Sequence, residues 1–272
     1  MAPGNNGVGA SSYTRYKQQH LNQILRTHLL ICSKVIPKNH WAHEEYHYFD
    51  LNAGPGTYSY DDEIIKGSPL VFLEEQKSIN IKCHAVFFEI DDGHRTKLVR
   101  NVANYADKPG LTLAFHGNHE KFLPCYFPTL LQKRVKKVFG LVYSDPTGSS
   151  PPFDLVQTML ARKCFSTLDI LFYFSATNYK RQLMAPACPL SNRLDEILRS
   201  INKKYWIVRE PYGNHQWTFL VGTNWTDFPK FERIGFHRID SPKGKGIFAK
   251  LNYTNLEMKS NGDFGHYHAS PL

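Results

Sequence analysis

The sequence predicts an α/β fold in which a doubly wound, mostly parallel sheet of seven strands carries helices on both faces. Segments typical of buried strands alternate with segments of helical periodicity between residues 46 and 210, as expected for a series of βαβ units. The first strand ends in a glycine-rich turn and the second ends in an acid, which is typical of α/β proteins that bind a nucleoside. Such sheets bind ligands at the carboxyl ends of their strands, so a site is expected there.

The first expected element is an amphipathic helix over residues 13–35, preceded by a flexible tail over residues 1–12. Apolar side chains recur at the spacing of one helical face: Leu21, Ile24, Leu25, Leu29 and Cys32. The tail lacks the charged and apolar regions of a signal peptide. Residues 13–272 are expected to form one domain, with this helix packed on its surface.

The other elements follow from hydrophobic periodicity and from Gly and Pro punctuation. Strands are expected over residues 46–51, 82–90, 111–115, 138–144, 168–175 and 205–210. Helices are expected over residues 69–78, 94–105, 122–132, 153–162 and 190–202. A turn at residues 212–215 then leads to an antiparallel edge strand over residues 217–222, and two short strands around residues 241–246 predict a small C-terminal β-hairpin within residues 228–260.

The composition is that of a globular chain with an excess of positive charge. The 272 residues are 42% hydrophobic, and the formal net charge is +9. Basic residues gather near aromatic residues at 133–137, 180–181, 203–204 and 243–245, a pattern that favours a polyanionic partner. We therefore expect the partner to be DNA or RNA, and not a membrane, because no apolar run reaches about 18 residues.

The cysteines and histidines predict neither a disulfide framework nor a metal site. Five cysteines are dispersed with no Cys-x-x-Cys pair, which indicates core thiols in a cytoplasmic protein. His43-Glu44-Glu45-Tyr46-His47 matches the His-Glu-x-x-His pattern of zinc proteases, which requires a helix. Here His47 belongs to the first strand, so no metal is expected.

The glycine-rich turn supplies the first candidate cofactor-binding residues. Asp50, Asn52, Ala53, Gly54 and Gly56 lie at the end of the first strand, where small residues let the backbone approach a ligand. The third glycine of the dinucleotide pattern is missing and the next helix is delayed, so a phosphate cradle is not predicted. The turn resembles motif I of class I methyltransferases, which implies the cofactor S-adenosyl-L-methionine and a Rossmann-like sheet.

Two further strands end in residues that suit the same cofactor. Glu89, followed by Ile90, is placed to accept hydrogen bonds from the hydroxyls of a ribose, and it resembles the ribose-binding acid of class I methyltransferases. Asn118 follows the third strand and is able to both donate to and accept from an adenine edge. A simple turn role for Asn118 is equally compatible with the sequence.

The fourth strand ends in the candidate catalytic residues Asp145, Pro146, Thr147 and Gly148. A proline after an acid fixes the backbone, so the Asp145 carboxylate and the Pro146 carbonyl are expected to point together at a planar amine. The four residues resemble the Asp-Pro-Pro-Tyr tetrad of amino-methyltransferases that modify adenine N6 or cytosine N4. They also resemble the Asp-Pro-Phe-Gly-Ser-Pro sequence of tRNA guanine-N2 methyltransferases.

This tetrad departs from the pattern because Gly148 offers no ring to stack on a flipped base. Phe153 or Tyr173 is expected to provide that ring, and Lys180 and Arg181, after the fifth strand, are expected to contact the substrate.

Taken together, the motifs are similar to those of the three-Cys-motif partner family, a methyltransferase-like group often encoded by phages and mobile elements. The resemblance is carried by residues 48–56, Gly67-Ser68-Pro69-Leu70, Phe88-Glu89-Ile90-Asp91, residues 144–148 and Lys180-Arg181. Two functions stay open: an S-adenosylmethionine-dependent methyltransferase acting on an exocyclic amine of a nucleic-acid base, or a catalytically silent module that retains the fold within a larger complex.

Overall fold

The computed structural model describes residues 12–42, 44–123, 137–179, 194–211, 216–226 and 228–251. Its core is an eight-stranded sheet with the strand order β10-β8-β9-β7-β6-β1-β4-β5. The strands are β1 (Tyr46–Asp50), β4 (Cys83–Phe88), β5 (Leu111–His116), β6 (Gly140–Ser144), β7 (Leu168–Ser175), β8 (Tyr205–Arg209), β9 (Trp217–Thr223) and β10 (Phe236–Arg238). The α/β class and the mostly parallel sheet predicted from the sequence are confirmed.

The sheet is doubly wound from β1, which pairs in parallel with β4 on one side and with β6 on the other. The parallel ladder continues to β5 and to β7 at the two sides. The antiparallel strand β9 lies between β7 and β8, not at the edge as expected. The edge is formed by β10, which pairs antiparallel with β8 and raises the strand number from the predicted seven to eight.

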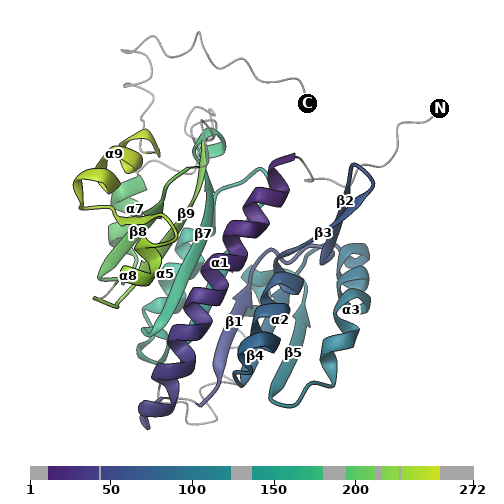
Figure 1. The fold of residues 1–272 in the computed structure, drawn as a ribbon. Helices are drawn as coiled ribbons and strands as arrows, with labels where there is room; N and C mark the ends of the chain where they lie inside the picture. The colour runs from purple at the N-terminus through teal and green to yellow at the C-terminus, as the bar shows by residue number, and fades with distance from the viewer. Residues whose placement is uncertain are drawn as a thin grey trace, which may run out of the picture.

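Helices cover both faces of the sheet (Figure 1). They are α1 (Ser12–Val35), α2 (Ser68–Ile79), α3 (Asp92–Ala106), α5 (Phe153–Leu160), α7 (Leu194–Ser200), α8 (Pro229–Glu232) and α9 (Pro242–Leu251), with 3-10 turns η1 (Ile36–Lys38) and η2 (Lys163–Phe165). Helix α1 crosses the front of the sheet beside α2 in Figure 1, as predicted for the N-terminal helix. Within the described ranges, no helix has the length and apolar character needed to cross a membrane.

Alternating strand residues supply two separate hydrophobic cores. Tyr48 and Phe87 face the cluster that contains the apolar side of α1, α2 and α3, whereas Phe49 and Phe88 face the cluster that contains α5 and α7. This alternation follows from the two-residue period of a strand, and it explains why all residues of β1, and all residues of β4 except His84, are buried. Both core layers therefore press on β1, whose carboxyl end begins the glycine-rich turn.

A two-stranded hairpin, β2 (Thr57–Tyr60) and β3 (Glu63–Lys66), lies between the glycine-rich turn and α2, and it was not predicted. Its tight turn holds Asp61 and Asp62 at positive φ, a conformation that Asp tolerates better than most residues. The hairpin stands beside the N-terminal end of α1 in Figure 1, where Arg15 pairs with Glu63. It accounts for the delay of the helix that follows the turn.

The predicted C-terminal β-hairpin is wrong, because its second half is the helix α9. Ser241 Oγ accepts a hydrogen bond from Gly244 N at 3.1 Å, and Pro242 is the first helical residue. A serine cap followed by proline is a strong helix start, so the basic residues Lys243 and Lys245 lie in the first turns of a helix.

Several expected features lie outside the described residues. They are the tail over residues 1–11, the greater part of the helix over residues 122–132, the basic residues 133–136, the turn at residues 212–215, Lys180 and Arg181.

Candidate active site

A cavity of about 550 Å³ lies at the carboxyl ends of the central strands. Segments that follow β1, β4, β5 and β6 line it, and α1 contributes Thr14 and Lys17. Among the residues predicted for the site, those lining the cavity are Asn52, Gly54, Glu89, Ile90, Asn118, Asp145, Pro146 and Thr147. The structure thus brings together residues that are 93 positions apart in sequence, such as Asn52 and Asp145.

The glycine-rich turn requires its glycines. Gly54 has φ +63°, and a Cβ atom there would lie 2.4 Å from Tyr58 Oη. Gly56 has φ +83°, and a Cβ atom there would lie 3.1 Å from Leu98 Cδ1. Both positions favour glycine for conformational and steric reasons, and Gly54 keeps the cavity wall free of a side chain.

Glu89 is fixed at the cavity wall by two backbone amides. Gly54 N donates to Glu89 Oε2 at 2.8 Å, and Asp91 N donates to Glu89 Oε1 at 2.9 Å. Each carboxylate oxygen has the capacity to accept two hydrogen bonds. Each oxygen of Glu89 therefore keeps one acceptor position for a ligand. A pair of vicinal hydroxyls, as in a ribose, matches this arrangement.

Asp50 does not reach the cavity, which corrects its expected direct contact with a cofactor. Its side chain is fully buried and accepts hydrogen bonds from Asn52 N at 3.2 Å and from the Ser68 side chain. Burial raises the pKa of Asp50 to about 7, although these hydrogen bonds act in the opposite direction. Asp50 therefore supports the glycine-rich turn from the buried side of the turn.

Asn52 connects the glycine-rich turn to the segment that follows β6. Its Oδ1 accepts a hydrogen bond from Ser144 Oγ at 2.8 Å and another from Asp145 N at 3.2 Å. The position of Asp145 is consequently tied to the turn that holds Gly54. Ser144 was not singled out from the sequence.

Asp145 is surrounded by one cation and several tyrosines. Lys17 Nζ donates to Asp145 Oδ2 at 2.7 Å, and the two side chains are only 18% and 16% exposed. Burial, followed by the charge of Asp145, raises the pKa of Tyr58 and of Tyr173 well above the ordinary value. The site is therefore aromatic around its carboxylate, even though Gly148 supplies no ring.

Asn118 begins a short helical turn at the cavity edge. Its Oδ1 accepts a hydrogen bond from Glu120 N at 2.7 Å, which is the geometry of a helix cap. The amide hydrogens on Nδ2 are left to donate to a ligand acceptor. Both the turn role and a ligand role are thus compatible with one side chain.

His119 lines the same edge and was not predicted. Burial lowers its pKa, so the imidazole is neutral at pH 7. Its place one residue after Asn118 is the only sequence signal that points to it. By contrast, Thr14, Lys17 and Tyr58 reach the cavity through packing of α1 and the β2–β3 hairpin, which no local pattern reveals.

Phe153 does not provide the expected stacking ring. It is 5% exposed and packs edge-on against Phe172, with ring centroids 5.3 Å apart, inside the core under α5. Tyr173, the other expected ring, does not line the cavity either, and its ring centroid lies 4.8 Å from Lys17 Nζ. Ala53 is buried with its amide bonded to Phe88 O at 2.9 Å, and Gly56 supports the turn without lining the cavity.

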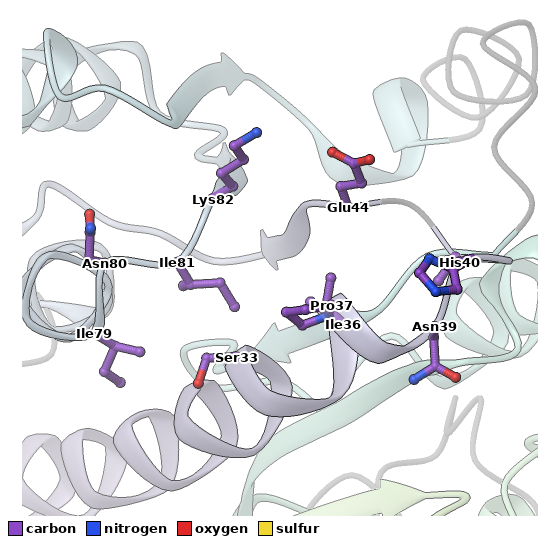
Figure 2. A pocket seen from close by; sticks show the side chains of 11 residues that line it. Ser33, Ile36, Pro37, Asn39, His40, Glu44, Ile79, Asn80, Ile81 and Lys82 are labelled. Carbon is purple, nitrogen blue, oxygen red and sulfur yellow. The ribbon is translucent and has the colours of Figure 1, made fainter.

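A second cavity of about 560 Å³ lies at the opposite ends of the strands (Figure 2). Glu44 and Lys82, which precede β1 and β4, line it together with Ile36 of η1 and Asn39, the residue after η1. It contains none of the predicted site residues. Because ligands of open parallel sheets bind at the carboxyl ends, the first cavity is the candidate active site.

The zinc-protease pattern is not supported by the strand that follows it. His47 is fully buried in β1, with its ring 5.7 Å from that of His84, and His43 lies outside the described residues. Across the described part of the chain, no group of three His, Cys, Asp or Glu side chains is arranged to hold a metal ion.

No protein-family model matches the chain, and no curated protein matches it. Solved structures similar to it include a human methyltransferase 10 domain containing protein, which is 9% identical over 83% of this chain and 89% of that chain, with a TM-score of 0.40. Another is the DszA carbon methyltransferase, 10% identical over 77% of this chain and 55% of that chain, with a TM-score of 0.43. A methyltransferase from Pyrococcus furiosus is 14% identical over 72% and 83%, with a TM-score of 0.34. At such identities and scores, the fold class rests on the strand order of the sheet itself.

Proposed function

We propose that this protein is an S-adenosyl-L-methionine-dependent methyltransferase that acts on an exocyclic amine of a nucleic-acid base. The observation that carries the proposal is the convergence of Gly54, Glu89 and Asp145 on one cavity at the carboxyl ends of β1, β4 and β6. The cavity volume of about 550 Å³ falls within the range of small-molecule sites.

The residues present fit the cofactor. Glu89 has acceptor capacity for two ribose hydroxyls, Ile90 offers an exposed apolar side chain, and Gly54 allows close backbone approach. When bound, S-adenosylmethionine supplies a methyl group on a positively charged sulfur. No phosphate is present in it, which agrees with a turn that lacks the dinucleotide glycine pattern.

On the acceptor side, Asp145 would accept a hydrogen bond from the amine and hold its lone pair toward the methyl donor. Such positioning supplies much of the rate when the donor is already charged. Asn52 and Ser144 fix Asp145 relative to the cofactor turn. The target amine would be adenine N6, cytosine N4 or guanine N2.

The cofactor assignment is tested by calorimetry with S-adenosylmethionine. Glu89→Ala is expected to weaken binding by about 1.5–3 kcal/mol, the range for hydrogen bonds to a charged group. Asp92→Asn is a matched control, since Asp92 pairs with Arg95 on α3 and does not line the cavity. Lack of binding to the unmodified protein would refute the assignment.

The reaction is tested by incubating the protein with cofactor and mixed DNA and RNA, followed by mass spectrometry of the nucleosides. Asp145→Ala is expected to abolish transfer and to retain most of the cofactor affinity, and Asp145→Asn is expected to lose less if a single accepted hydrogen bond is sufficient. A 5-methylcytosine or ribose-methyl product would contradict the proposal. Cofactor binding without transfer to any nucleic acid would favour the catalytically silent module.

A further inference from the structure

The first turns of α1 place an ammonium group inside the candidate active site. Lys17 Nζ donates to Asp145 Oδ2 at 2.7 Å and lies 4.8 Å from the centroid of the Tyr173 ring. Asp145 directly follows β6, and Tyr173 lies on the neighbouring strand β7 one residue beyond the partner of Ser144. One cation therefore contacts two groups that stand side by side at the carboxyl end of the sheet.

Asp145 is the group that would receive the exocyclic amine of a base, whereas the Tyr173 ring does not line the cavity and supports the ammonium of Lys17. We propose that Lys17 is an internal competitor that occupies the acceptor position until a nucleic-acid base displaces it. This inference rests on the function proposed above, and it concerns how access to Asp145 is controlled.

An ammonium group is able to occupy the acceptor position without being methylated. A protonated amine has no lone pair, so Lys17 satisfies Asp145 without being able to accept a methyl group. Its four-carbon stem is flexible, so the ammonium is able to leave Asp145 while α1 stays in place. Partial exposure of both side chains lets water replace the contact.

The contact is not needed to hold α1 on the sheet. His28 of α1 bonds to the buried residues Tyr46 and Asp169, and Asn22 and Arg26 bond to Glu75 of α2. The apolar face of α1 is also part of the core. Removal of the Lys17 charge is therefore expected to leave the fold intact.

Lysine acylation followed by peptide mass spectrometry tests the contact without methyl transfer. Lys17 is expected to react roughly 5-fold more slowly than the exposed Lys97 of α3, consistent with the modest strength of a partly exposed ion pair. Asp145→Asn is expected to raise the Lys17 rate roughly 5-fold and to leave the Lys97 rate unchanged. Equal Lys17 rates in the unmodified protein and in Asp145→Asn would overturn the proposal.

Steady-state kinetics test the competition, with the nucleic acid that the protein is found to methylate as the varied substrate. Lys17→Met removes the cation and retains much of the apolar stem, so the KM for the acceptor is expected to fall roughly 5- to 30-fold while kcat changes little. Lys17→Arg keeps a cation and is expected to keep a KM near that of the unmodified protein. An unchanged or higher KM in Lys17→Met, or recovery of methylated Lys17 after incubation with cofactor, would overturn the competitor role. Lack of transfer in every variant would refute the proposed function alone, since acylation reads the Lys17 contact independently.

Discussion

A single carbonyl oxygen, Oδ1 of Asn52, joins the two halves of the candidate site. It accepts hydrogen bonds from Ser144 Oγ and Asp145 N, so the glycine-rich turn and the segment that follows β6 share one support. The sequence identified Asn52 as part of the turn but not as this link. The reason is physical: a turn motif constrains its own backbone, whereas the partner of a side chain is set by the pairing of β1 with β6.

A local motif constrains its own backbone but not the distant surroundings of its side chains, and this difference also explains which other site residues were predicted correctly. Gly54 and Glu89 were predictable because a glycine turn and an acid after the next strand are local features of parallel sheets. Asp50 was assigned to the cavity because it ends a strand, and Phe153 because Gly148 supplies no stacking ring, yet both side chains point into the interior and are buried. A shift of one residue reverses the side to which a side chain points.

Gly54 and Gly148 form a matched pair for a prediction about the turn. Both have positive φ, +63° and +72°, but a Cβ at Gly54 meets Tyr58 Oη at 2.4 Å and a Cβ at Gly148 meets nothing within 4 Å. We expect Gly148→Ala to lower the free energy of unfolding by about 1 kcal/mol through backbone strain alone. Gly54→Ala is expected to lower the free energy of unfolding by more than Gly148→Ala does. Tyr58→Phe is expected to restore part of this additional loss.

Urea denaturation of the two single variants and of Gly54→Ala combined with Tyr58→Phe measures these differences. Equal costs for both glycines would show that the contact with Tyr58 is relieved without strain.

At the scale of elements, hydrophobic periodicity located the helices and strands that build the core, because burial imposes a regular spacing on them. The β2–β3 hairpin was missed because its strands are only partly buried and therefore carry a weak pattern. Helix α9 was mistaken for a hairpin because its Gly and Lys residues suggested a turn, while the Ser241 cap and Pro242 were overlooked. The capping residues Ser241 and Pro242 therefore account for the helix that begins at this point.

The docking of α1 gives a prediction at this scale. His28 Nε2 lies 3.0 Å from Asp169 Oδ2, His28 Nδ1 lies 2.8 Å from Tyr46 Oη, and the His28 and Asp169 side chains are 1% and 3% exposed. We expect His28→Leu to lower the free energy of unfolding by about 3–5 kcal/mol, because a buried acid loses its partner. Replacing both His28 and Asp169 by Leu is expected to cost less than His28→Leu alone, since the buried carboxylate is then removed together with its partner, while the Tyr46 hydroxyl loses His28 in both variants.

Urea unfolding followed by circular dichroism measures both effects. Arg15→Ala serves as a control, because the Arg15–Glu63 pair also involves α1 but is largely exposed, and its loss is expected to cost at most about 1 kcal/mol. A double variant less stable than His28→Leu would contradict the assignment of a buried pair.

At the scale of the whole molecule, the site depends on contacts that no segment encodes by itself. Lys17 and Asp145 are 128 residues apart and meet because α1 packs across the sheet and β6 is a neighbour of β1. The parallel direction of the central strands follows from the βαβ alternation, which is why the end of the sheet that holds the site was predictable. The aromatic and cationic surroundings of Asp145 were not.

The pKa of Asp50 gives a pH dependence of global stability. Burial raises its folded-state pKa from 3.8 to about 7, so between these pH values the folded chain binds a proton that the unfolded chain releases. The contribution of Asp50 to stability is therefore largest below pH 4 and declines as pH rises to about 7, with a slope of at most about 1.4 kcal/mol per pH. Asp50→Asn is expected to remove this decline.

The difference in unfolding free energy between the unmodified protein and Asp50→Asn, measured by urea titration at several pH values from 4 to 8, isolates the Asp50 contribution. A difference that does not vary with pH would show that Asp50 is ionised throughout.

The net charge of +9 leads to the last prediction, which concerns the nucleic-acid partner. If Lys180 and Arg181 each neutralise a phosphate, their double replacement by Ala should reduce the slope of log affinity against log salt by about 1.4–1.8, since each contact contributes about 0.7 on single strands and 0.9 on duplex DNA. Lys77 and Lys82 provide a matched control with the same loss of charge, because both are exposed near the amino ends of the strands, away from the candidate site. Fluorescence anisotropy with labelled DNA and RNA across a salt series distinguishes local contact from overall charge. Equal changes in slope for the two double variants would mean that binding follows net charge alone, and a reduction confined to the Lys180 and Arg181 variant would show that these two residues contact the nucleic acid.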